Sequence, residues 1–134
     1  MNIDGPKISK IKETVLYVKD IEATEKFYHG LLGLPVISKD EGRLIFFRAG
    51  ESVLLCFEPE QSKVKTSAPP HYGYGNLHYA FECSRDDYEP WKEKIRSLGI
   101  EIEREIDWGN DVFSFYFRDP DNHCCEILMP GLWD

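Results

Sequence analysis

The stretch Y-F-R-D-P-D-N-H-C-C-E-I-L-M, residues 116–129, decides the fold because it predicts two strands joined by a tight turn. Proline at the second turn position, with Asp and Asn around it, is typical of a hairpin. His123 follows this turn and is predicted to be a turn or rim residue rather than a ligand. Glu126 then lies on a strand of cysteines and aliphatic residues. A buried strand rarely keeps an unpaired charge, so a metal, a hydrogen-bond donor or an arginine such as Arg118 or Arg43 is expected to hold Glu126.

The chain has 134 residues, enough for one domain, residues 1–134, with an ordinary hydrophobic core. Its net charge of −8 argues against nucleic acid and anionic membranes as partners. The beginning of the chain is short and polar and the apolar runs have the length of strands, so a cytoplasmic location is expected. The four cysteines lack C-x-x-C spacing and are predicted to be buried thiols.

The first half is predicted to run strand, helix, strand, strand, strand. Residues 11–18 are rich in β-branched and aromatic side chains, as strands are. Asp20 is placed to cap a helix, and Gly33 stands where that helix needs a left-handed residue to end. The other strands are predicted at residues 34–37, 43–48 and 52–57.

The segment of residues 58–75 is rich in proline and glycine, which predicts a linker or lid without regular structure. It separates the first half of the chain from the second.

The second half repeats the order of the first. A strand at residues 77–83 precedes a helix with Asp87 as its predicted N-cap, so that Pro90 falls in the first turn. Gly99 ends this helix within L-G-I as Gly33 ends the first within L-G-L, which indicates an internal duplication. The later strands are predicted at residues 100–105, 112–117 and 124–129.

The duplication predicts an α+β fold of two β-α-β-β-β modules. Module one is expected at about residues 8–58, the connector at residues 59–75 and module two at about residues 76–130.

Matching the two helix ends also places polar residues. Glu13 lies 20 residues before Gly33 and His78 lies 21 residues before Gly99, so the two are equivalent. Leu55 is the first-half counterpart of Glu126. If the modules curve around a shared cleft, strand alternation lets Glu13, His78 and Glu126 converge in it.

Three segments carry a family resemblance: residues 15–34, 77–82 and 117–128. With their spacing, the chain resembles the vicinal oxygen chelate superfamily, which includes glyoxalases, extradiol dioxygenases, fosfomycin-resistance proteins, methylmalonyl-CoA epimerases and bleomycin-sequestering proteins. The resemblance implies that the modules form a half-open, eight-stranded mixed barrel around one divalent metal. It also implies that Glu13, His78 and Glu126 bind this metal and that a small substrate chelates it through neighbouring oxygens.

The chain departs from the superfamily at two of these positions. Most relatives have His, sometimes Gln, where this chain has Glu13, and glyoxalases have a fourth ligand where it has Leu55. A classical glyoxalase is therefore disfavoured, and an enzyme of the broader glyoxalase or dioxygenase type is expected. Extradiol dioxygenases use two His and one carboxylate, and fosfomycin-type transferases also have His at the first position. A bleomycin-type protein needs no metal.

One imidazole and two carboxylates would leave coordination positions open, as catalytic sites do. Such a donor set suits Mn²⁺, Fe²⁺, Co²⁺, Ni²⁺ or Zn²⁺. The metal would act as a Lewis acid, and Glu13, Glu126 or His71 would move protons. His71 is alternatively a solvated loop histidine.

Two classes of function remain open. One is a metal-dependent lyase, isomerase or dioxygenase, and the other is a small-molecule- or antibiotic-binding protein of the same fold without catalysis. The apolar tail, residues 130–133, predicts either a homodimer or a tail folded back on its own domain.

Overall fold

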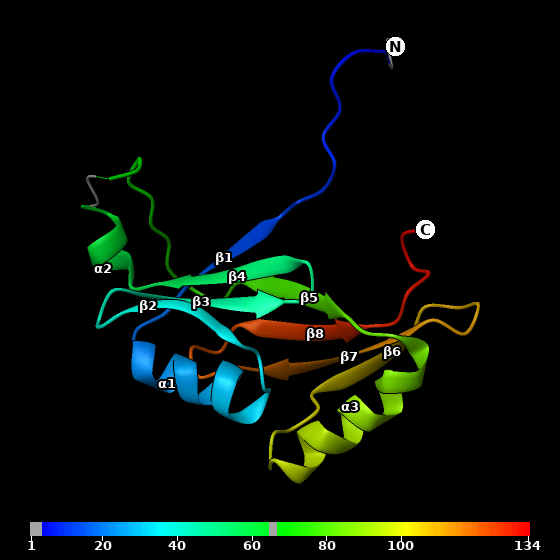
Figure 1. Cartoon of the computed structure of the whole chain (residues 1–134). Coiled ribbons are helices and arrows are strands. Elements are labelled where there is room, and N and C mark those ends of the chain that lie inside the picture. Colours follow the sequence, from blue (N-terminus) through cyan, green and yellow to red (C-terminus); the bar gives the residue numbers. More distant parts are fainter. Residues whose placement is uncertain (1–3, 65–66) are drawn as a thin grey trace.

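The computed structural model describes residues 4–64 and 67–134. The chain runs β-α-β-β-β twice and forms two four-stranded sheets, which confirms the predicted α+β class and module order. Figure 1 shows α1 and α3 on one side of the two sheets and the connector with α2 on the other. The elements are β1 (Glu13–Tyr17), α1 (Ile21–Glu25), the π-helical turn η1 (Lys26–Leu31), β2 (Val36–Asp40), β3 (Leu44–Ala49), β4 (Ser52–Phe57), α2 (Pro59–Ser62), β5 (His78–Glu82), α3 (Arg85–Ser97), β6 (Arg104–Asp107), β7 (Phe113–Arg118) and β8 (Cys124–Leu128).

Both sheets are mixed and have the same topology. The strand orders are β1-β4-β3-β2 and β5-β8-β7-β6, and in each sheet the first strand pairs in parallel with the last. Glu13 lies opposite Val53 in one sheet and His78 lies opposite Cys124 in the other. Leu55 and Glu126 each follow two residues later. The strand registers thus give Glu13 and His78 equivalent positions, and likewise Leu55 and Glu126.

The helix-facing residues of both sheets pack into one hydrophobic core. Polar groups inside it join the modules: the Tyr28 hydroxyl donates to the Asp119 carboxylate over 2.7 Å, and the Tyr79 hydroxyl donates to Tyr28 over 2.9 Å. Burial raises the pKa of both tyrosines, which keeps these hydroxyls protonated.

His123 is buried in the core at 0% exposure, so its prediction as a rim residue is wrong. Its Nδ1 accepts from the Leu77 amide over 2.9 Å, and its Nε2 lies 2.8 Å from the Tyr17 carbonyl oxygen, to which it donates. The imidazole therefore links the end of β1 to the segment that leads into β5.

Helix α3 begins earlier than predicted. Ser84, not Asp87, is the N-cap, and its hydroxyl accepts from the Asp87 amide over 3.2 Å. Pro90 consequently lies inside the helix. Pro90 has no amide hydrogen to donate to the Asp86 carbonyl, four residues earlier. Because both residues are exposed, water can replace that hydrogen bond.

The connector, predicted to have no regular structure, begins with the short helix α2. Pro59 occupies the first turn, where its missing amide is not needed, and the Glu58 carboxylate accepts from the Gln61 amide over 3.0 Å.

No helix in the described ranges is long and apolar enough to cross a membrane, and the cytoplasmic location stays a prediction. Trp133 is 86% exposed, whereas Pro130 and Leu132 are half-buried and Gly131 lies against Val112, so only part of the tail packs on its own domain. The homodimer stays a prediction.

Candidate metal-binding site

A histidine and a carboxylate meet on one face of module two. Parallel pairing of β5 with β8 sets Ala80 opposite Glu126, and strand alternation puts His78 on the same face as Ala80. His78 Nε2 lies 3.3 Å from Glu126 Oε1. The Glu126 side chain is 7% exposed and the His78 side chain is 53% exposed. The pair thus consists of a buried carboxylate beneath a histidine that is open to solvent.

The other nitrogen of His78 fixes the orientation of the ring. His78 Nδ1 lies 2.8 Å from the Cys124 carbonyl oxygen, which can only accept, so Nδ1 carries a hydrogen. In a neutral imidazole, Nε2 then directs its lone pair at the Glu126 carboxylate. The lone pairs of His78 Nε2 and Glu126 Oε1 repel each other unless a proton or a cation lies between the two atoms. The donor chemistry of the pair therefore fits a metal ion, with Cys124 orienting the imidazole ligand.

Neither arginine considered for Glu126 from the sequence contacts it. Arg118 forms an ion pair with Glu103 over 2.9 Å, and Arg43 pairs with Asp40 over 3.3 Å. The prediction that an arginine holds Glu126 is wrong, because the carboxylate faces His78 instead.

Tyr116 also belongs to this site, and it was not among the metal ligands or catalytic residues predicted from the sequence. It lies directly opposite Glu126 in the pairing of β7 with β8, and its ring centroid is 6.2 Å from that of His78. Burial raises the pKa of Tyr116, and the negative charge of Glu126 raises it further. The phenol therefore stays protonated and can donate a hydrogen bond at the site.

Glu13 does not join the pair within one chain. It is exposed at the start of β1. In residues 4–64 and 67–134, no three His, Cys, Asp or Glu side chains lie together as a group that could hold a metal. The structure brings together His78 and Glu126, two of the three predicted ligands, and the three-ligand site stays a prediction.

His71 packs on module one, on the strand that begins with Glu13. His71 Nδ1 lies 2.8 Å from the Tyr17 hydroxyl, and its ring meets Phe57 edge-on at 4.6 Å between centroids. Gly73 lies against the same tyrosine ring, since a Cβ added there would be 2.9 Å from ring atoms. His71 is therefore a packed, hydrogen-bonded residue and not a solvated loop histidine.

Comparison with known proteins settles the family. The model of the Glyoxalase/Bleomycin resistance protein/Dioxygenase superfamily matches residues 10–127. The chain belongs to this superfamily. The glutathione transferase FosA of Serratia marcescens is 27% identical over 125 residues, which are 93% of this chain and 84% of FosA. The metallothiol transferase FosB of Bacillus licheniformis is 26% identical over 134 residues, covering 98% of this chain and 82% of FosB.

Solved structures of other superfamily proteins agree with the fold. The crystal structure of a lactoylglutathione lyase from Agrobacterium tumefaciens superposes with a TM-score of 0.90 at 33% identity, covering 96% of this chain and 98% of that one. The fosfomycin resistance protein FosX of Listeria monocytogenes superposes with a TM-score of 0.68 at 24% identity, covering 95% and 98% of the two chains, which shows a shared fold. The predicted resemblance to the vicinal oxygen chelate proteins is confirmed.

Proposed function

We propose that this protein is a divalent-metal-dependent enzyme of the superfamily that acts on a small oxygenated substrate. The observation that carries the proposal is the pair His78 and Glu126, in which an oriented imidazole nitrogen and a buried carboxylate oxygen stand 3.3 Å apart. The metal-related and transferase names of the relatives support it.

Glu13, His78 and Glu126 are the proposed ligands, with Glu13 supplied by a second copy in a homodimer. Both β1 and β5 are outer strands of their sheets, and both Glu13 and His78 are exposed on them. A second copy whose β1 lies beside β5 would bring its own Glu13 to the pair. A metal held there would be a Lewis acid toward a carbonyl or hydroxyl oxygen, and Mn²⁺, Fe²⁺, Co²⁺, Ni²⁺ or Zn²⁺ would suit the donors.

The chain's own side chains would bind the substrate and move protons. The protonated Tyr116 phenol, beside Glu126, donates a hydrogen bond to a substrate oxygen. Glu13 and Glu126 are the proposed proton acceptors. His71 Nδ1 lies 2.8 Å from the Tyr17 hydroxyl, and this hydrogen-bonded pair is the proposed proton relay on module one.

Leu55 argues against one reaction class, and the relatives add another. Leu55 is 8% exposed and offers no ligand at the position where glyoxalases have one, which disfavours isomerisation of a thiol adduct. The relatives named as glutathione and metallothiol transferases add group transfer to the candidate lyase, isomerase and dioxygenase reactions.

Replacing Glu126 by glutamine tests the ligand assignment. The substitution keeps the side-chain volume and removes the charge, so it should abolish most stabilisation by metal without unfolding the domain. A metal at about 100 times its Kd should stabilise wild type by about 2.7 kcal/mol. Melting temperature is measured with chelator and with Mn²⁺, Ni²⁺ or Zn²⁺. Glu93→Gln, an exposed carboxylate on α3, is the matched control and should respond like wild type.

The opposite pattern of melting temperatures would contradict the proposal. If chelator and metal leave wild type unchanged while Glu126→Gln melts far lower, Glu126 is a structural core residue. If metal stabilises the wild type, the metal-loaded protein is tested for turnover of a methylglyoxal–thiol adduct, a catechol, and an epoxide antibiotic with a thiol. Metal binding without turnover of any of them would favour the small-molecule-binding alternative.

A further inference from the structure

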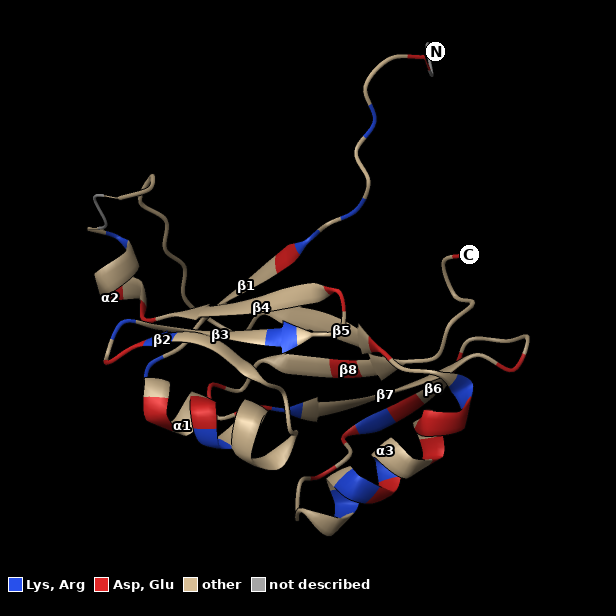
Figure 2. Cartoon of the chain, viewed as in Figure 1, with Lys and Arg blue, Asp and Glu red and all other residues tan. Residues whose placement is uncertain are grey.

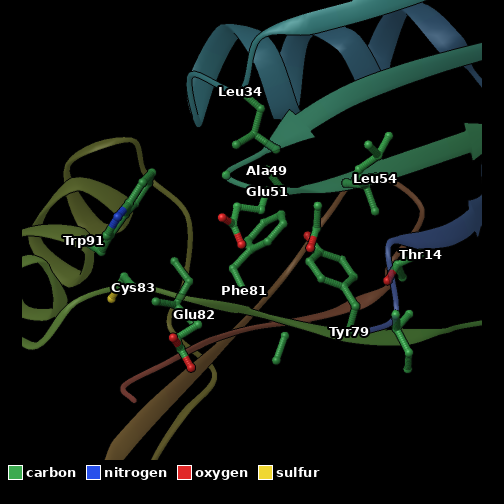
Figure 3. A pocket seen from close by; sticks show the side chains of 16 residues that line it. Thr14, Leu34, Ala49, Glu51, Leu54, Tyr79, Phe81, Glu82, Cys83 and Trp91 are labelled. Atoms are coloured by element: carbon green, nitrogen blue, oxygen red, sulfur yellow. The ribbon is translucent and has the colours of Figure 1, made fainter. Parts of the chain in front are cut away.

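A cavity of about 600 Å³ lies between the two modules, away from the predicted metal ligands. Module one contributes β1, the β3–β4 turn and Leu34, and module two contributes β5 and α3. Figure 3 shows Leu34, Phe81 and Trp91 around it. Glu13, His71, His78 and Glu126 do not line the cavity, although Ala80, which lies opposite Glu126, does.

The cavity has apolar walls and acidic edges. Its walls include Leu54, Phe81 and Trp91. Its only charged lining residues are the carboxylates Glu51 and Glu82. Glu82 is exposed, and its side chain has no hydrogen bond or ion pair in the described part of the chain. An apolar side chain next to a positive charge therefore matches both the walls and the edges.

The N-terminal arm, residues 4–12, offers that chemistry. It extends away from the body of the protein and carries lysines on a chain with a net charge of −8, as Figures 1 and 2 show. Two large apolar side chains lie on it in solvent: Ile8 is 91% exposed and Ile11 is 82% exposed. The arm combines apolar side chains that match the cavity walls with basic groups that match its acidic edges.

Contacts at the base of the arm tie it to the rim of the cavity of its own chain, which Ile11 also lines. Lys10 Nζ lies 3.1 Å from Glu51 Oε2, and Lys12 Nζ donates to the Glu51 carbonyl. Both hold the arm at the β3–β4 turn on the rim of that cavity. Ile8 is five residues before Glu13, so an extended arm carries it about 17 Å beyond the start of β1. That length is enough to reach a neighbouring molecule.

We propose that the N-terminal arm of one copy docks in the inter-module cavity of a second copy. Ile8 packs against Phe81 and Trp91, and a lysine of the arm lies beside Glu82. The proposal rests on the homodimer in the proposed function but on neither the metal nor the reaction, and it adds the surface through which the copies hold each other.

A disulfide between copies tests the docking directly, because Cys83 lines the cavity. One variant carries Ile8→Cys with Cys83→Ser, its partner keeps Cys83, and both carry Cys124→Ser. Burial raises the pKa of Cys83 to about 11, so oxidation is catalysed with copper–phenanthroline. We expect a reducible heterodimer in the mixture, with residue 8 linked to Cys83 by peptide mass spectrometry, a linkage that neither variant alone can form. A dimer by light scattering that gives no covalent product in the mixture overturns the docking and leaves the metal site untouched.

Dimer dissociation gives an independent readout. Ile8→Ser removes an aliphatic side chain that the proposed docking buries. The substitution should raise the dimer Kd about tenfold or more by analytical ultracentrifugation. Ile37→Ser is the control, since Ile37 is a 46%-exposed residue of β2, and it should leave the Kd unchanged. If Trp133→Ser weakens the dimer and Ile8→Ser does not, the apolar tail and not the arm holds the copies together. A wild type that stays monomeric also overturns the docking, whatever its response to metal.

Discussion

The two modules repeat one framework but carry different polar residues at equivalent positions. Where module two has His78 and Glu126, module one has Glu13 and Leu55 in the same strand register. The framework repeats because the same alternation and the same helix-ending glycines occur twice. The proposed chemistry depends on a few side chains that only module two brings together.

A second difference lies where the helix of each module meets the outer strand β2 or β6. In module one, Lys39 on β2 pairs with Glu25 on α1 over 2.7 Å. In module two the charges are exchanged, since Lys92 on α3 pairs with Glu105 on β6 over 2.9 Å. Figure 2 shows acidic residues on α1 and charged residues of both signs on α3. The contact between helix and outer strand is therefore repeated, although the residue types are reversed.

The largest predicted effect of a substitution comes from His123. Because His123 is fully buried, His123→Ala leaves a cavity and withdraws the imidazole from the Leu77 amide and the Tyr17 carbonyl. We expect a loss of about 3 to 5 kcal/mol in the free energy of unfolding, measured with urea.

The matched position in module one is Ser52, which precedes Val53 as His123 precedes Cys124. Ser52 is half-buried, so Ser52→Ala should change the free energy of unfolding by no more than about 0.5 kcal/mol. Equal losses in the two variants would show that His123 is not a special link between the modules.

A smaller effect is expected when the carboxylate of module two is copied into module one. Leu55→Glu buries a charge, and its neighbour at the equivalent of His78 is Glu13, another carboxylate. We expect a loss of about 2 to 4 kcal/mol at pH 7 by urea unfolding. Adding Glu13→His recreates the histidine–carboxylate pair and should recover part of the loss. No recovery in the double variant would mean that the two positions are not equivalent in space.

The sequence predicted the module order because each element has its own local signal. Gly33 and Gly99 end the helices at φ of +83° and +76°, values that favour glycine. Ser84 and Asp87 both suit an N-cap, and three residues separate them, so pattern alone could not choose between them. His78 and Glu126 could be predicted because duplication assigned each a strand and a face.

The remaining parts of the site depend on distances between elements that the pattern does not contain. Tyr116 faces Glu126 through the register of β7 with β8, which the length of the intervening turn sets. His123 links Leu77 to Tyr17 across the module boundary. Convergence of Glu13 with the pair depends on how the modules, or two copies, are placed relative to each other, and strand alternation carries no information on that.

The smallest predicted effect concerns the reversed charge pair of module two. Burial raises the pKa of Glu105, but hydrogen bonds from Lys92 and Tyr88 outweigh it, so the pKa lies below its ordinary value of 4.5. A carboxyl whose pKa is lowered on folding stabilises the protein above its unfolded pKa, and this contribution is lost as the pH falls through the folded pKa. Glu105→Gln should therefore cost about 1 kcal/mol at pH 7 and less below pH 4. Urea unfolding of wild type and variant between pH 3 and pH 7 measures the difference. Lys92→Glu should cost a similar amount, and adding Glu105→Lys should restore it, because the double variant has the charge order of module one. If the Glu105→Gln curve runs parallel to wild type at every pH, the ion pair contributes nothing to stability and the contact of α3 with β6 rests on apolar packing alone.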